Sequence, residues 1–128
     1  MVYTYDYDNQ NYNPSMPVIE IQVGRAGTTP TFVVTALVDS GADATIIPLP
    51  ILKRLRARKG EKAVMRGTTP GRIPVDLYYV ALELPGYHHA HLPIVGDLTN
   101  NEVILGRDVL NHLVVTLNGL ASVVELNE

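Results

Sequence analysis

The sequence predicts an all-β fold, a small barrel or folded sheet with one or two short helices. Short β-branched segments recur along the chain, and Gly, Pro or Asn residues separate them. Only two segments have the composition of a short helix, one at 51–58 and one from Arg107 to about Leu113. At 128 residues the chain is long enough for one hydrophobic core but too short for two.

The first segment, residues 1–16, is a polar arm rich in Tyr, Asn and Asp, and residues 17–128 are expected to form the folded domain. Tyr3, Tyr5 and Tyr7 alternate with polar residues, so the arm is able to add as a strand to a sheet edge. The same polar composition is typical of a mobile terminus, and of the two alternatives we favour mobility.

Two strands are expected to follow the arm. Residues 18–23 alternate between apolar and polar, which indicates a half-buried strand. After a turn at 24–30, residues 31–38 are apolar on both faces, which predicts an interior strand paired with the first.

The second half of the chain predicts two hairpins. Residues 63–66 and 72–84 are expected to pair around a tip at Gly67–Gly71, and 87–95 adds another strand. Residues 103–106 form a buried strand that runs into the helix beginning at Arg107. Residues 114–117 and 120–126 are joined by Asn118-Gly119, which predicts a type I′ turn.

Composition excludes several classes of protein. The formal charge of −3 does not favour nucleic acid, and the absence of cysteine excludes disulfides, thiol nucleophiles and zinc–thiolate sites. The segment Met1–Asp8 lacks the features of a signal peptide, and no apolar stretch reaches the ~18 residues of a membrane helix. We therefore expect a soluble, cytoplasmic protein that binds neither membranes nor nucleic acid.

Asp39 is the principal candidate for chemistry. An apolar, β-branched run leads to it, Ser40-Gly41 follows, and a second apolar run leaves on the far side. A carboxylate in apolar surroundings is costly without a partner, so a chain that presents an acid in this way is expected to use it. The alternative is a structural Asp that caps a turn, which is common before Ser-Gly.

Two motifs carry a resemblance to a known family. Asp39-Ser40-Gly41, followed by Ala42, resembles the active-site signature of aspartic proteases. The run 103–108, Val-Ile-Leu-Gly-Arg-Asp, resembles the apolar-apolar-Gly-Arg/Asn turn that supports the active-site loop in retropepsins. Between them, the tip Gly67–Gly71 stands where that family carries its flap. From about residue 18 to 126 the chain resembles a retropepsin-like aspartic protease, similar to the single-domain cellular and bacterial forms.

The resemblance implies a role for each matched residue. Asp39 is the implied catalytic carboxylate, Ser40 carries a hydroxyl that hydrogen-bonds across a dimer axis, and Gly41 offers its amide to a carboxylate. Asp43 and Arg107 match positions that form an ion pair in retropepsins. Independently of the resemblance, a cation in the first turn of a helix opposes the helix dipole, so Arg107 is expected to need a partner.

The remaining implied sites fall into two groups. The residues expected to contact substrate are Ala42, Asp43, Gly67, Thr68, Thr69, Pro70 and Gly71. The residues expected to support the active loop are Gly106, Arg107 and Asp108. The resemblance implies a retropepsin-like acid protease barrel, with a flap that closes over an extended peptide or protein segment, and neither a metal nor a cofactor.

The chemistry predicts a homodimer. Two neighbouring carboxylates share one proton and so supply the base and the acid that peptide hydrolysis needs. The chain has one Asp-Ser-Gly, so the second carboxylate must come from another copy, with the two Asp39 residues meeting at a two-fold axis. Because retropepsins build a dimer sheet from chain termini, we expect the apolar segment Val123–Leu126 at the interface.

Three other interpretations stay open. One is a retropepsin-fold module that dimerises or binds peptides with little or no catalysis. A second is a metal protein, although His89 and His91 would share one strand face and His88 would point away, which gives at most two ligands. A third is a nucleic-acid site formed by the basic residues of Lys53–Lys59. For these residues we favour the alternative that they form the solvent-exposed face of a helix.

Overall fold

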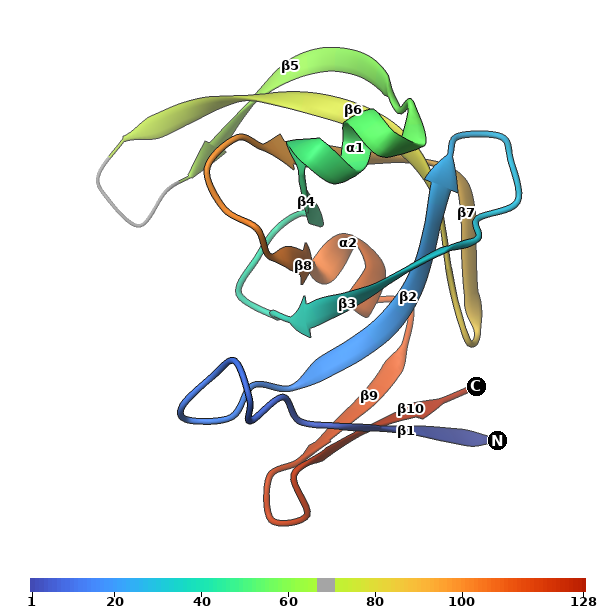
Figure 1. Cartoon of the computed structure of the whole chain (residues 1–128), viewed down its shortest axis with the longest axis vertical. Coiled ribbons are helices and arrows are strands. Elements are labelled where there is room, and N and C mark those ends of the chain that lie inside the picture. Colours follow the sequence, from blue (N-terminus) through green and yellow to red (C-terminus); the bar gives the residue numbers. More distant parts are fainter. Residues whose placement is uncertain (67–70) are drawn as a thin grey trace.

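The structure, a computed structural model, describes residues 1–66 and 71–128 (Figure 1). It is mostly β, with 57% strand and 9% helix, and six strands close into a barrel. The predicted all-β fold with short helices is therefore confirmed. The elements are β1 (Val2–Asp6), β2 (Val18–Arg25), β3 (Phe32–Val38), β4 (Ile46–Pro48), α1 (Leu49–Leu55), β5 (Arg58–Arg66), β6 (Arg72–Leu84), β7 (Tyr87–Asp97), β8 (Val103–Leu105), α2 (Arg107–Leu110), β9 (Val114–Asn118) and β10 (Val123–Asn127).

Two sheets make up the fold. The larger sheet has the strand order β2-β3-β8-β4-β7-β6-β5, and an additional pairing of β2 with β6 closes it. The smaller sheet, which we call the terminal sheet, has the order β1-β10-β9. In Figure 1 the terminal sheet lies at the bottom of the view, and the β5–β6 hairpin arches over the top.

The core lies inside the barrel. Alternation in β2 points Ile19, Ile21 and Val23 inward, and each side chain is at most 1% exposed. Leu52 of α1 covers one end of this core. The helix spans 49–55 rather than the expected 51–58, because Pro50 is tolerated in a first turn and Arg56 adopts a left-handed conformation that ends the helix. The other large side chains buried to below 2% exposure are Ile47, Val80, Leu82, Ile94, Leu105, Val109, Val124 and Leu126.

The N-terminal arm contributes an edge strand. Strand β1 is antiparallel to β10, with Tyr3 opposite Leu126 and Tyr5 opposite Val124. The side chains of Tyr3, Tyr5 and Tyr7 pack against the core. Of the two arrangements that the sequence allowed for Val2–Asp6, the structure contains the edge strand rather than the mobile arm.

Strand β3 differs from its prediction. Val33 is 53% exposed and Thr35 is also exposed, whereas Ala36 is completely buried. The prediction of an interior strand was wrong because only one face of β3 packs against the core. The β-branched residues on the other face satisfy strand geometry without being buried.

The turn of the terminal hairpin also differs from its prediction. Residues 119–122 connect β9 to β10, and Ser122 rather than Gly119 has a positive φ, of 55°. The Asn118 side chain accepts a hydrogen bond from the Ala121 amide at 3.1 Å. The predicted type I′ turn was wrong because Asn118 uses its side chain to cap a longer turn instead of adopting a left-handed conformation.

Strand β10 is the central strand of the terminal sheet. It pairs with β1 on one side and β9 on the other, and Val124 and Leu126 are fully buried in the core. Val123–Leu126 is therefore not a free edge of the sheet, and its place at a dimer interface stays a prediction. Strand β1 of the arm, for which edge pairing was the less favoured of two alternatives, covers one side of β10.

Candidate active site

Strand β3 delivers Asp39 to an exposed turn. Val38 pairs with Leu105 of the parallel strand β8, and the Asp39 amide donates to the Leu105 carbonyl at 3.2 Å. The Asp39 carbonyl accepts from the Ala42 amide at 3.2 Å, which closes the turn. Residues Asp39, Ser40 and Gly41 are all exposed in the single chain.

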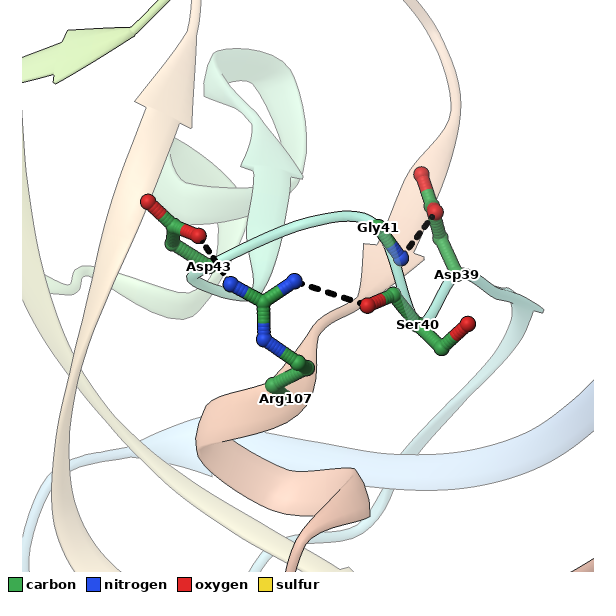
Figure 2. A network of polar contacts seen from close by, with 5 residues as sticks. All are labelled: Asp39, Ser40, Gly41, Asp43 and Arg107. Carbon is green, nitrogen blue, oxygen red and sulfur yellow. Dashed lines mark hydrogen bonds and ion pairs between the residues drawn. The ribbon is translucent and has the colours of Figure 1, made fainter.

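The Asp39 carboxylate is oriented by the next glycine. Its Oδ1 accepts a hydrogen bond from the Gly41 amide at 2.9 Å, and the second carboxylate oxygen points away from the loop (Figure 2). A Cβ at position 41 would lie 3.2 Å from Oδ1, tighter than ordinary contact. Glycine therefore lets the backbone approach the acid closely and hold it with an amide.

Arg107 fastens the loop to α2. Its Nη1 donates to the Ser40 carbonyl at 2.7 Å, its Nη2 pairs with the Asp43 carboxylate, and its amide donates to the Ala42 carbonyl at 2.9 Å (Figure 2). The expected ion pair between Asp43 and Arg107 is thus present. The two side chains are 72% and 42% exposed, so in the single chain the pair positions the loop more than it stabilises the fold.

A buried network beneath the loop was not found from the sequence. Thr45 is fully buried; its hydroxyl donates to Asp108 Oδ1 at 2.8 Å and accepts from the Gly106 amide at 3.2 Å. Asp108 Oδ2 accepts from the Thr45 amide at 2.9 Å, and Oδ1 also accepts from the Val109 amide at 2.9 Å. A hydroxyl in an otherwise apolar run was the one sequence signal for this network. Asp108 therefore joins the start of α2 to the end of the loop through Thr45, and the support role that the resemblance implies for it stays a prediction.

Gly106 is required where the two loops meet. A Cβ at this position would lie 2.5 Å from the Ala44 carbonyl carbon and 2.6 Å from its oxygen. Real side chains do not occupy such space, so the backbone of the Asp39 loop and the start of α2 are in direct contact. The two motifs that the sequence placed far apart form one unit.

The β5–β6 hairpin lies above this unit in Figure 1. Val64 pairs with Pro74, and the side chains of Val64 and Ile73 are 60% and 49% exposed. Gly71 has a φ of +126°, which suits the end of a hairpin turn. The expected flap residues Gly67, Thr68, Thr69 and Pro70 lie outside the described residues.

A cavity of about 330 Å³ lies between the hairpin and the end of β7. Leu49, Ile73, Tyr78 and Leu98 contribute its apolar lining, and Asp97 is one of its charged lining residues. Burial pushes the pKa of Asp97 upward, but hydrogen bonds from Thr99 and Asn100 outweigh it and hold that pKa below its usual value. The loop after β7 is therefore braced in its ordered form by an ionised carboxylate.

A second cavity, of about 660 Å³, lies on a different part of the barrel. It is bounded by β2, the β6–β7 turn and Glu128, and no residue of the Asp39 loop lines it. No residue of the Asp39 loop lines the smaller cavity either; it lies against the β5–β6 hairpin, through Lys62 and Ile73, and against α1, through Leu49.

The histidines of β7 lie apart from this site. His89 Nδ1 accepts from the His91 amide at 3.2 Å, and His88 Nδ1 lies 3.4 Å from Glu83 Oε1. Across residues 1–66 and 71–128, no group of three or more His, Asp or Glu side chains is arranged to hold a metal ion. In the same part of the chain, neither helix has the length and apolar character to cross a bilayer.

Comparison with known proteins places this geometry in a family. The model of the retroviral aspartyl protease family matches residues 13–118. A retropepsin-like aspartic protease from Rickettsia conorii has a similar structure, with a TM-score of 0.71, 13% identity, and coverage of 99% of this chain and 92% of that one. The EIAV protease complexed with the inhibitor HBY-793 gives a TM-score of 0.56 at 21% identity, over 80% of this chain and 89% of that one. No protein with a curated description matches the sequence significantly.

Proposed function

The chain belongs to the retroviral aspartyl protease family, and from that premise we propose that it is an aspartic endopeptidase that works as a homodimer. The observation that carries the proposal is the single Asp39-Ser40-Gly41 loop. Its carboxylate is exposed and held by the Gly41 amide, and Arg107 fixes the loop behind it. Such a loop presents an acid to something outside its own chain.

The proposed reaction uses two Asp39 carboxylates that share one proton. The ionised carboxylate takes a proton from a water molecule as that water attacks the peptide carbonyl carbon. The protonated carboxyl gives its proton to the carbonyl oxygen, which yields a neutral tetrahedral intermediate. Collapse of the intermediate breaks the C–N bond, and the leaving nitrogen takes up the proton that came from water and is held on the first carboxyl. One hydroxyl of the intermediate returns its proton to the second carboxylate, so the carboxylic acid product forms and the pair again shares one proton. No metal and no covalent intermediate are needed.

The homodimer follows from the number of loops. The chain has one Asp-Ser-Gly, so each site needs a second copy. A two-fold axis beside the exposed Asp39 loop brings equivalent groups together, including the Ser40 hydroxyl, which points away from Arg107 in Figure 2. We assign Ser40 to a hydrogen bond across this axis and Gly41 to the orientation of the acid.

The proposed substrate is an extended peptide segment held beneath the β5–β6 hairpin. The hairpin residues 67–71 would close over the peptide backbone, with Ala42 and Asp43 beneath it. We assign the cavity of about 330 Å³ to an apolar substrate side chain, because Leu49, Ile73 and Leu98 line it.

The test is cleavage of a mixed peptide library by purified protein at several pH values. Asp39→Ala abolishes cleavage and leaves the fold intact, because the Asp39 side chain is exposed and bonded only to its own loop among the described residues. Asp6→Ala, which removes an exposed carboxylate from β1, leaves cleavage unchanged. Cleavage is fastest at acidic to neutral pH, where the pair keeps its shared proton.

Two results would refute the proposal. One is an Asp39→Ala protein that cleaves as fast as the wild type. The other is a wild-type protein that binds peptides from the library and hydrolyses none of them at any pH, which would make the chain a binding module of the same fold.

A further inference from the structure

The cavity of about 660 Å³ lies where β2 and β6 separate. Their pairing ends where Gln22 is opposite Glu83. Beyond this pair β2 extends back to Val18 without β6, because β6 ends at Leu84 and turns into β7. The space that remains beside β2 has the size of an ordinary ligand pocket.

One side of the cavity is a row of side chains from four neighbouring strands. The row runs from Val33 of β3 through Gln22 and Glu83 to His88 of β7. Residues directly opposite each other in a sheet point to the same face, and the core-facing side chains of β2 are Ile19, Ile21 and Val23, so the row lies on the outer face of the barrel. The exposed face of β3, where Val33 is 53% exposed, therefore borders the cavity.

The charged groups that line the cavity are carboxylates, with His88 as the one basic side chain. They belong to Glu20, Glu83 and Glu128, and among the described residues no lysine or arginine joins them, although the chain has ten. Glu83 Oε1 lies 3.4 Å from His88 Nδ1, and Glu128 Oε2 accepts from the Tyr3 hydroxyl at 3.0 Å. Glu20 is exposed and has no ion-pair partner within the described part of the chain. A concave surface lined by one sign of charge concentrates ions of the opposite sign.

The uncharged part of the lining suits a long, planar cation. Tyr3 and Tyr87 supply aromatic rings, and Ile21, Val33 and Leu84 supply apolar surface. The aliphatic stem of an arginine packs on apolar surface, and its guanidinium stacks on aromatic rings and binds carboxylates through paired hydrogen bonds. Lysine would match the charge of the cavity but not these planar contacts.

We propose that this cavity is a second peptide-binding site, which holds an arginine side chain from a basic segment of another protein. The guanidinium binds Glu20 and Glu83, which occupy diagonal positions on β2 and β6, because Glu20 lies two residues from the partner of Glu83 in the sheet. One arginine fills only part of a cavity of about 660 Å³, so neighbouring residues of the segment occupy the rest. No residue of the Asp39 loop lines the cavity, so the inference does not depend on the proposed function.

The first test compares two probe peptides. One is a short capped peptide of Gly and Ser that carries two arginines, and the other carries citrulline in their place, which keeps the shape of arginine and removes its charge. Binding is measured by titration calorimetry with the Asp39→Asn protein, so that no peptide is hydrolysed. The citrulline peptide is expected to bind at least about tenfold more weakly, because hydrogen bonds between charged groups are about twice as strong as neutral ones.

The second test locates the binding with variants of the same protein. Glu20→Gln and Glu83→Gln are each expected to weaken binding of the arginine peptide about fivefold or more, because each removes one carboxylate from the guanidinium. Asp6→Asn is the matched control, since Asp6 is an exposed acid of β1 that does not line the cavity, and it leaves binding unchanged. Backbone amide shifts in NMR spectra are expected to change at Ile21 and Gly86 when the arginine peptide is added.

Four results would overturn the inference. They are no binding of the arginine peptide, equal affinity for the citrulline peptide, equal affinity of the Glu20→Gln and Asp6→Asn proteins, and amide shifts confined to the Asp39 loop, which would place the peptide in the candidate active site. None of them bears on the protease proposal, because hydrolysis is not measured. A wild-type protein that cleaves no peptide would likewise leave this site standing.

Discussion

Replacing Thr45 with valine tests whether the buried network holds the active loop. Valine keeps the shape of threonine and removes only the hydroxyl, which donates to Asp108 Oδ1 and accepts from the Gly106 amide. The Thr45 amide keeps its bond to Asp108 Oδ2, and Oδ1 keeps its bond from the Val109 amide. The perturbation is therefore confined to two hydrogen bonds.

The expected loss of stability follows from these two bonds. Leaving the Gly106 amide without its acceptor costs about 1–3 kcal/mol, and a hydrogen bond to a carboxylate contributes about 1.5–3 kcal/mol. The two effects overlap, so we expect the free energy of unfolding to fall by about 3 kcal/mol. For a domain of this size that is a decrease of about 12 °C in the melting temperature, at about 4 °C per kcal/mol.

Urea denaturation at one fixed protein concentration measures this loss, because association adds to apparent stability. Thr35→Val is the matched control, since Thr35 is an exposed threonine of β3 and its replacement should change stability by less than about 0.5 kcal/mol. We also expect Thr45→Val to lower peptide cleavage, because two of the hydrogen bonds between the end of the Asp39 loop and the start of α2 are lost. A Thr45→Val protein as stable as the Thr35→Val control would refute the role assigned to the network.

Three further predictions concern the same unit and the arm. Gly106→Ala should destabilise the fold by about 3 kcal/mol or prevent folding, because the new Cβ would lie 2.5 Å from the Ala44 carbonyl carbon; an urea midpoint within error of the wild type would contradict that contact. Arg107→Lys should reduce cleavage at least about tenfold, because a lysine ammonium cannot bond Ser40 and Asp43 at the same time as the guanidinium does. The free energy of unfolding should change by less than about 1 kcal/mol, because the ion pair is exposed. Full activity of this variant would show that Arg107 does not support the loop. The hydrogen bond to Glu102 raises the pKa of Tyr12 from 10.0 to about 12. The stability that this hydrogen bond gives the folded state is therefore complete below pH 10 and is lost as the pH rises through about 12. The difference in urea midpoint between the wild type and Tyr12→Phe should therefore shrink between pH 10 and pH 12, and a constant difference would contradict the assignment.

Local patterns predicted the parts of the fold that depend on a single strand. The alternation of residues 18–23 placed Ile19, Ile21 and Val23 in the core, because a two-residue period fixes which side chains share a face. The family motifs also identified the Asp39 loop and its contact with Arg107. The Asp39 motif acts through a backbone amide and a short side chain within its own loop, and the second motif reaches that loop through the Arg107 guanidinium, so the residue types of the two motifs reveal the geometry.

These local patterns could not predict contacts between residues that are far apart in sequence. Strand β1 is stabilised by β10, at the other end of the chain, and nothing in the polar arm shows that its tyrosines reach the core. Thr45 and Asp108 are also far apart in sequence, so the sequence did not show which residue would bond the buried hydroxyl. The sequence also did not show that one face of β3 is exposed. β-Branched residues favour strands whether or not a second layer covers them, so their presence does not predict burial.

The most direct test of the central claim is cleavage by mixed dimers. Wild-type and Asp39→Asn proteins are mixed in equal amounts, allowed to exchange subunits, and assayed at the same total concentration as the wild type alone. If each site needs an Asp39 from both subunits, random pairing leaves about a quarter of the dimers active, and the rate should fall to about a quarter of the wild-type rate. A rate of about half would show that each subunit hydrolyses peptides with its own Asp39, and would contradict the shared site.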